Sequence, residues 1–204
     1  MSWRDTLFVW RGTLVGDGDR LTFEGSWVGA TTGPGLPSLS EHEASENVFS
    51  VTGRIPGGGI DDLDGKTWTV DGGAYQLDNG EGLEEHADDA YTVEFKEAES
   101  GAADEPRRVL AWSVGENEFG KFIIAGSMPE AGVLCLQRRY IDNKDARATY
   151  DMAALYEALS SQAVPEGFEA GWLYRGEAWA GEVMSEGLQR APKRRRRVGP
   201  PAAV

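Results

Sequence analysis

In the stretch RLTFEGSW, residues 20–27, apolar side chains or glycine alternate strictly with polar side chains. One phase contains Leu21, Phe23, Gly25 and Trp27, and the other contains Arg20, Thr22, Glu24 and Ser26. Successive side chains of an extended strand point to opposite faces, so this stretch predicts a strand with one buried and one solvated face. Such one-sided strands are typical of antiparallel sheets.

Seven further segments repeat the alternation and are also predicted to be strands. They are LFVWRGTL (7–14), NVFSVTGRI (47–55), KTWTVDGGAYQL (66–77), AYTVEFKEA (90–98), RVLAWSV (108–114), FGKFIIAGS (119–127) and GVLCLQRRY (132–140). Several links between them, such as GDGD (16–19) and GENE (115–118), are short and rich in turn residues. Short links of this kind join neighbouring antiparallel strands as hairpins. The fold class is therefore predicted to be mainly β.

Five of these strands have a glycine in the phase that we expect to face inward. They are the strands with Gly12, Gly25, Gly53, Gly72 and Gly126. A glycine inside a strand is typical of a site where the strand bends or bulges at the corner of a barrel. We therefore expect about eight strands in an antiparallel up-and-down barrel. A two-sheet β-sandwich is the alternative.

The chain divides into four predicted parts, of which residues 1–142 form the barrel. Residues 143–162 change to helical spacing and are expected to form an amphipathic helix packed on the barrel. Its apolar positions are Ala148, Met152, Leu155, Tyr156 and Leu159, and Asp145 is positioned to cap its start. Residues 163–187 are an aromatic and acidic extension, which either adds to the barrel or docks to a partner. Residues 188–204 are predicted to be a disordered basic tail.

Two resemblances follow from the strand segments. WRGTL (10–14) and LTFEGSW (21–27) resemble the strands of avidin-like and other calycin-type barrels. GENEFGKFIIAG (115–126) and LCLQRRY (134–140) resemble an uncharacterised β-domain found in many proteins of unicellular eukaryotes. The first resemblance implies a barrel fold. Neither implies an activity or a set of functional residues.

The chain is acidic, although it ends in a basic run. It has 34 Asp and Glu against 20 Lys and Arg, which gives a net charge of −14. Five basic residues are consecutive in the tail: Lys193, Arg194, Arg195, Arg196 and Arg197. Without them, 15 basic residues stand against 34 acidic ones, so the rest of the chain carries −19. A body this acidic repels the phosphate backbone, so we do not expect it to bind nucleic acid.

The basic tail has the pattern of a targeting signal. Pro192, the basic run and Val198 together resemble the single-cluster nuclear import signal of the large T antigen type. This resemblance implies binding to an import receptor and a location in the nucleus, with the cytoplasm as the alternative. The physical reason is that an extended basic peptide presents each cation to an acidic receptor pocket. The competing interpretation is a solvated tail without a receptor.

Other chemistries have little support in the sequence. The single cysteine, Cys135, excludes an internal disulfide. The stretch GGGIDDLDGKTW (57–68) has the wrong glycine spacing for a phosphate-binding loop. DNGEGLEEHADD (78–89) lacks the alternating ligands of a calcium loop. We expect no metal, no cofactor and no membrane span, and we identify no catalytic residue, since His42 and His86 lie in predicted loops without a nearby nucleophile.

Three sets of residues are candidates for binding. Inward aromatic side chains can line a pocket for a small molecule or simply fill the core: Trp10, Trp27, Trp68, Tyr75 and Trp112. Acidic loop residues are candidates for contact with basic proteins: Glu84, Glu85, Asp88 and Asp89. Aromatic residues of the extension are candidates for apolar docking: Phe168, Trp172, Tyr174 and Trp179.

The sequence therefore predicts a non-enzymatic β-barrel that binds protein partners through acidic loops or through the aromatic extension. A calycin-like barrel that binds a small ligand is the first alternative. An enzyme with an unrecognised site is the second.

Overall fold

The computed structural model describes residues 3–31, 37–60, 62–78, 80–97, 109–130 and 132–160. Its strands are β1 (Thr6–Asp17), β2 (Arg20–Thr31), β3 (Val48–Arg54), β4 (Thr67–Asp78), β5 (Leu83–His86), β6 (Tyr91–Glu97), β7 (Val109–Asn117), β8 (Gly120–Glu130) and β9 (Val133–Tyr140). They form one antiparallel sheet in the order β3-β2-β1-β9-β8-β7-β6-β4-β5.

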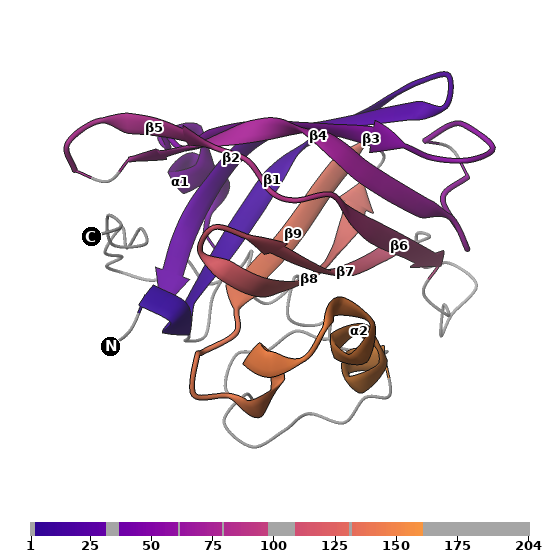
Figure 1. Ribbon diagram of the computed structural model, residues 1–204. Helices are drawn as coiled ribbons and strands as arrows, with labels where there is room; N and C mark the ends of the chain where they lie inside the picture. Colours follow the sequence, from indigo (N-terminus) through magenta and orange to yellow (C-terminus); the bar gives the residue numbers. More distant parts are fainter. Residues whose placement is uncertain are drawn as a thin grey trace, which may run out of the picture.

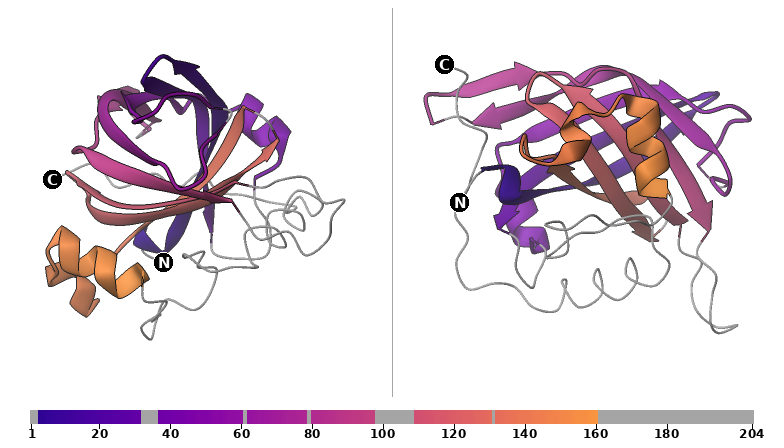
Figure 2. Two further views of the ribbon diagram at one scale, coloured as in Figure 1. Left: turned by 90° about the vertical axis from the view of Figure 1, so that its right-hand side faces the viewer. Right: turned by 60° about the horizontal axis from the view of Figure 1, so that its bottom comes forward.

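An additional pairing between β3 and β4 closes the sheet into a ring. Eight strands form this up-and-down barrel, and β5 is an extra strand that pairs with β4 outside it (Figure 1; Figure 2, left). The predicted fold class is confirmed, and the sandwich alternative is wrong. The extra strand lies within a segment that was predicted to be an acidic loop.

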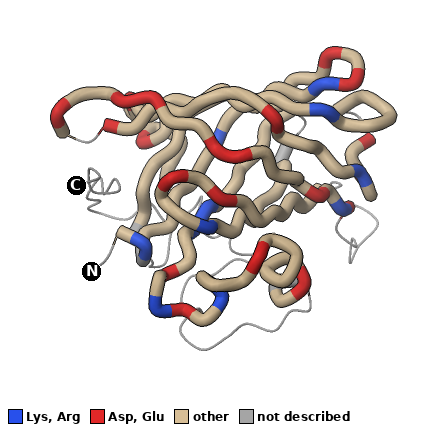
Figure 3. The backbone as a smooth tube through the Cα atoms, in the orientation of Figure 1, with Lys and Arg blue, Asp and Glu red and all other residues tan. Residues whose placement is uncertain are grey.

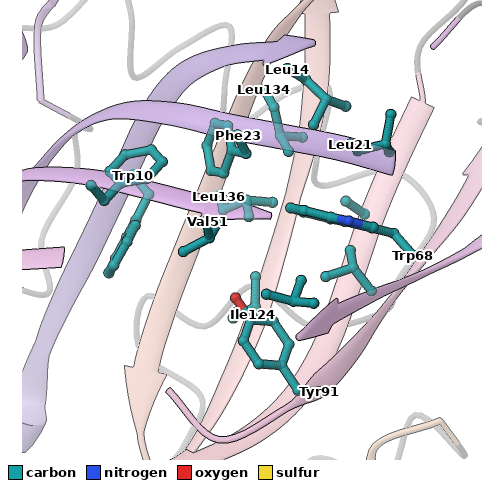
Figure 4. Packing of buried hydrophobic residues seen from close by; sticks show 14 of the residues in the cluster. Trp10, Leu14, Leu21, Phe23, Val51, Trp68, Tyr91, Ile124, Leu134 and Leu136 are labelled. Carbon is teal, nitrogen blue, oxygen red and sulfur yellow. The ribbon is translucent and has the colours of Figure 1, made fainter. Parts of the chain in front are cut away.

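The interior is one continuous core built from the inward phase of the strands. Figure 4 shows labelled side chains of β1, β2, β3, β4, β6, β8 and β9 pointing toward one another, with Trp68 of β4 close to Leu21 of β2. Trp68, Leu21 and Leu134 are completely buried. Removal of this apolar surface from water is the main force that stabilises the barrel.

One strand, β7, has the orientation opposite to the one predicted. Ala111 belongs to the interior core, whereas Trp112 and Val114 point outward and are buried beneath α2 (Met152–Ser160). The prediction that Trp112 lines the interior is therefore wrong, because a helix gives the outer face of β7 an apolar environment of its own. Inside the barrel, the ring of Phe122 occupies the space above Gly115, where a Cβ atom would lie 2.4 Å from the ring.

Glycines mark the points where strand backbones approach too closely for a side chain. Gly12 and Gly25 are register partners in β1 and β2. A Cβ atom on Gly12 would lie 2.0 Å from the carbonyl oxygen of Glu24, and one on Gly25 would lie 2.2 Å from that of Arg11. Equivalent Cβ atoms on Gly53 and Gly126 would also lie 2.0 Å from a backbone oxygen. The backbones of neighbouring strands therefore approach closely at the positions where the sequence predicts a bend.

In β4 the close approach is made by a different glycine from the one expected. Gly72 is exposed, and a Cβ atom on it would meet only the methyl group of Thr52 at 3.5 Å. Gly73 instead has a φ of 106°, and its Cβ atom would lie 2.2 Å from the carbonyl oxygen of Ser50. A shift of register between Thr52 and Gly53 lies beside it. This irregularity moves the tight position by one residue.

The link between β2 and β3 contains a short helix, α1 (Leu39–Glu43), where a loop was predicted. Ser38 and Glu41 form a capping box at its start, which satisfies backbone donors of the first turn. His42 was expected in a loop, but it lies in α1 and is buried, and its backbone oxygen accepts a hydrogen bond from Ser26 Oγ of β2 at 2.7 Å.

The segment after β9 forms two helices instead of the single predicted one. Asp145 caps a 3-10 helix, η2 (Ala146–Thr149), and the chain is extended at Tyr150 before α2 begins. Leu155 of α2 is completely buried against the outer face of β7. Trp112 Nε1 and the hydroxyl of Tyr156 both donate to the Glu94 carboxylate of β6, which fixes α2 on the barrel.

Candidate functional site

One end of the barrel, which we call the mouth, is formed by the start of β1, the β7–β8 turn and the end of β9 (Figure 1). A 3-10 helix, η1 (Trp3–Asp5), precedes β1 at this end. The Trp3 ring lies 5.0 Å from the Tyr140 ring and 6.3 Å from the Phe119 ring, measured between centroids. Aromatic side chains therefore cover part of the mouth.

The barrel wall is irregular at the mouth. β6 pairs with Thr67–Val70 of β4, whereas β5 pairs with Tyr75–Asp78 of the same strand. Residues 87–90, which join β5 to β6, form no strand. The backbone N–H of Asp89 donates to the carbonyl oxygen of Glu116 in β7 at 3.1 Å. These four residues, the 87–90 link, therefore complete the wall between β4 and β7.

Asp88 points from this link into the barrel and pairs with Arg138 of β9. Arg138 Nη1 donates to Asp88 Oδ1 at 3.0 Å, and Nη2 donates to Oδ2. The two side chains are only 3% and 4% exposed. Removing two charges from water costs several kcal/mol for each ion, and only close bidentate geometry with further hydrogen bonds offsets this cost.

Polar side chains from the wall surround this ion pair. Asn117 Nδ2 lies 2.8 Å from Asp88 Oδ1, and the hydroxyls of Tyr75 and Tyr140 are within 3.1 Å of the same nitrogen. Burial raises the pKa of Tyr75 above its ordinary range. Burial by itself lowers the pKa of Arg138, but Asp88 and the neighbouring tyrosines together raise it, so the net shift is upward. The guanidinium is charged under all physiological conditions.

Arg138 is also held between aromatic rings. Its Cζ atom lies 4.5 Å from the ring centroid of Trp10 and 4.1 Å from that of Phe122, distances at which the ring quadrupoles attract the cation. Arg138 Nε and Trp10 Nε1 are buried and have no hydrogen-bond partner among the described residues. Two donors at the mouth therefore have no acceptor within the part of the chain that the structure describes.

The space around Arg138 is small. It lines one cavity of about 20 Å³ with Trp27 and Tyr75, and another of about 10 Å³ with Phe23 and Tyr91. A cavity of 10 to 15 Å³ by this measure holds about one water molecule. The space around Arg138 is therefore largely filled by side chains, which agrees with the alternative that the inward aromatic residues fill the core.

The predicted pocket residues separate into three groups. Trp10, Trp27 and Tyr75 come together at the mouth, as a pocket would require. Trp68 lies toward the opposite end, where its Nε1 atom is next to Gly53. Trp112 lies outside the barrel beneath α2.

The outer side of the mouth is acidic. The β4–β5 hairpin extends past the ring of the barrel and carries carboxylates (Figures 1 and 3). The side chains of Glu84 and Glu118 are 58% and 55% exposed, and Glu85 and Asp89 are also exposed. Glu84, Glu85, Asp89 and Glu118 are called the acidic rim below.

His86 joins the two sides of this rim. Its Nδ1 atom lies 2.6 Å from Glu118 Oε1, and its Nε2 atom lies 3.8 Å from a Glu84 oxygen. Its ring contacts those of Tyr75 and Phe119, with centroids 5.7 Å and 5.1 Å away. The last residue of β5 is thereby connected to the β7–β8 turn.

The structure corrects the prediction for Asp88. It was grouped with Glu84, Glu85 and Asp89 as a surface residue, but its carboxylate is inside the mouth on Arg138. A buried carboxylate in an ion pair cannot contact an external partner. The other three residues are on the surface, as expected.

Two other groups of predicted residues lie outside the described residues. They are the aromatic residues Phe168, Trp172, Tyr174 and Trp179, and the basic run Lys193, Arg194, Arg195, Arg196 and Arg197. Their roles stay predictions.

Sequence reasoning missed Arg138 as a site residue, although a signal was present. In the predicted strand GVLCLQRRY (132–140), the alternation puts the apolar residues Leu134, Leu136 and Tyr140 in one phase, and Arg138 lies in that same phase. A charged residue in an inward phase requires a buried partner. No comparable signal distinguishes Asp88 from the adjacent Asp89.

Among the described residues, no group of three or more His, Cys, Asp or Glu side chains is arranged to hold a metal ion. None of the described helices has the length and hydrophobicity required to cross a membrane.

Comparison with protein-family models, with curated proteins and with solved structures gave no match. The resemblance to avidin-like and calycin-type barrels therefore stays a prediction.

Proposed function

We propose that this protein is a non-enzymatic β-barrel module that binds basic proteins at the acidic rim of its mouth. The supporting observation is that four exposed or half-exposed carboxylates, on β5, the 87–90 link and the β7–β8 turn, lie around one end of the barrel. They come from three elements that the fold brings together. Negative potential from such a group attracts and orients a positively charged partner.

The rest of the molecule is suited to a supporting role in this proposal. The interior is filled, so the barrel acts as a rigid scaffold that presents the rim. The alternative, a small-molecule carrier, requires room that the side chains now occupy, since the cavity at the mouth measures about 20 Å³. The net charge of −14 is also more compatible with basic protein partners than with nucleic acid.

Neutralising the rim should weaken binding of a basic partner without unfolding the barrel. For the triple variant Glu84→Gln, Glu85→Gln and Asp89→Asn, we expect the affinity for a lysine- and arginine-rich peptide to fall about tenfold at low salt, because each exposed charge pair contributes up to about 1 kcal/mol. In the parent protein, binding should weaken strongly between about 50 and 300 mM salt as screening increases. Calorimetric titration measures both effects.

A matched control removes the same kind of charge at the other end of the barrel. Asp17 and Asp19 are exposed at the β1–β2 turn, so the Asp17→Asn, Asp19→Asn variant should bind almost as well as the parent. Losses in proportion to the charges removed, three in the rim variant and two in the control, would show that only net charge matters. Binding that survives high salt in the rim variant would contradict the proposal and favour the aromatic segment from Phe168 to Trp179.

We also propose that the basic tail directs the protein to the nucleus. Replacing Lys193, Arg194, Arg195, Arg196 and Arg197 with alanine should move a fluorescent fusion from the nucleus to the cytoplasm, because the import receptor would lose its cationic contacts. A control with lysine at all five positions retains the charge and should stay nuclear. A parent fusion that is never nuclear, or an alanine variant that stays there, would rule out the import role.

A further inference from the structure

The mouth contains a set of donors arranged for a carboxylate. Arg138 of β9 contributes two guanidinium N–H groups, and Asn117 of β7 contributes its side-chain amide. Both residues are on regular strands that pair with β8, so their positions are fixed by the barrel. A planar guanidinium binding both oxygens of a carboxylate is the most specific geometry available for this anion.

The carboxylate that occupies these donors comes from a different kind of element. Asp88 belongs to the 87–90 link, which has no strand pairing, and the neighbouring Ala87, Asp89 and Ala90 are exposed. The described hydrogen bonds of the link to the barrel wall are those of the Asp88 side chain and the backbone bond from Asp89 to Glu116. The backbone that carries Asp88 is thus held by fewer hydrogen bonds than the strands that carry Arg138 and Asn117.

A second observation points to an acceptor that Asp88 does not supply. Arg138 Nε and Trp10 Nε1 are buried at the mouth without a hydrogen-bond partner among the described residues. The Arg138 side chain is 3% exposed, so these donors cannot be solvated by bulk water. Unsatisfied buried donors are rare in folded proteins, because each one costs free energy that a ligand acceptor would recover.

We infer that the mouth is a binding site for a small organic carboxylate with an aromatic or aliphatic body, which takes the place of Asp88 on Arg138. The anionic group binds Arg138 and Asn117, and the apolar body packs against Trp10, Trp27 and Phe119, which line the adjoining cavity. Since that cavity measures about 20 Å³, the ligand enters only when the 87–90 link moves outward with Asp88. Asp88 thus competes with the ligand for Arg138 and keeps the affinity of the mouth for the carboxylate low. The inference does not require a basic partner, although the link that moves carries Asp89 of the acidic rim.

Removing the competitor provides a direct test. In the full-length Asp88→Ala variant, sodium phenylacetate and sodium butyrate should raise the melting temperature by about 5 °C or more at concentrations about a hundredfold above Kd. Sodium chloride at equal ionic strength, and the neutral amides of the same two acids, should have no such effect. If the alanine variant does not fold, the same measurement is made on Asp88→Asn, which keeps the shape of the side chain.

The parent protein must respond to the same probes. Phenylacetate should produce a saturable change in the NMR signals of Trp10 Nε1 and Arg138 Nε, with a Kd at least tenfold weaker than in Asp88→Ala, since Asp88 competes in the same molecule. The Arg138→Gln variant should show neither signal changes nor stabilisation. Absence of a saturable response in the parent protein, or equal responses to the acid and its amide, would overturn the inference.

Discussion

Replacing Asp88 with alanine should lower the free energy of unfolding by about 3 to 5 kcal/mol. The cause is the guanidinium left behind: Arg138 is 3% exposed and would keep its charge in a site where water does not reach it. Asn117 Nδ2 would lose one of its acceptors, Asp88 Oδ1 at 2.8 Å, in the same step. The loss is larger than for any exposed charge on this barrel, because surface pairs contribute at most about 1 kcal/mol.

Urea unfolding followed by tryptophan fluorescence measures this loss. Asp89→Ala is the matched control, because Asp89 is the next residue of the same link and is exposed, so its replacement should change stability by less than about 0.5 kcal/mol. In the double variant Asp88→Ala, Arg138→Met, most of the lost stability should return, since no unpaired charge remains buried. Equal stabilities of Asp88→Ala and Asp89→Ala would show that Asp88 is not buried on Arg138.

A single methyl group at Gly25 should destabilise the barrel by about 3 kcal/mol, the upper end of the usual range for overpacking. The added Cβ atom would lie 2.2 Å from the carbonyl oxygen of Arg11 and 2.6 Å from the Cα atom of Gly12. Both are backbone atoms, so no side-chain rotation relieves the contact. The strands β1 and β2 would have to separate where the sheet bends.

Gly16→Ala is the control for Gly25→Ala, because Gly16 lies on the paired strand β1 and a Cβ atom there makes only ordinary van der Waals contacts, with a methyl carbon of Leu21 at 3.5 Å and the backbone nitrogen of Ile60 at 3.6 Å. This change should be neutral or stabilise the protein by up to about 1 kcal/mol, through lower entropy of the unfolded chain. Thermal unfolding of both variants gives the difference. A Gly25→Ala protein that melts with the parent would contradict the close approach of β1 and β2.

The barrel could be predicted because its determinants are local. Alternation sets the two faces of a strand, and glycines such as Gly12 and Gly25 indicate where the sheet bends. The orientation of β7 could not be predicted in this way, since Trp112 is apolar whichever face it occupies. Its outward position depends on α2, which lies more than 35 residues further along the chain, and on Phe122, whose ring fills the space above Gly115.

The candidate site was less predictable because it depends on contacts distant in sequence. The inward phase of β9 indicates that Arg138 is buried, but its partner is 50 residues away in a segment with many similar carboxylates. Asp88 and Asp89 are the same type of residue. They differ only in position, because the 87–90 link points Asp88 into the mouth and leaves Asp89 exposed. The acidic rim was partly predictable, since Glu84, Glu85 and Asp89 lie in a charged stretch, whereas Glu118 joins them only because the sheet brings the β7–β8 turn close to β5.

The proposal that basic proteins bind at the acidic rim is tested most directly by mapping the contact on the isotope-labelled full-length protein. Addition of a lysine- and arginine-rich peptide at low salt should shift the backbone NMR signals of Glu84, Glu85, Asp89 and Glu118, and these shifts should disappear in the Glu84→Gln, Glu85→Gln, Asp89→Asn variant. Signals at the β1–β2 turn, near Asp17 and Asp19, should stay unchanged. Shifts that spread equally over both ends of the barrel, or that persist in the rim variant, would contradict the proposed surface.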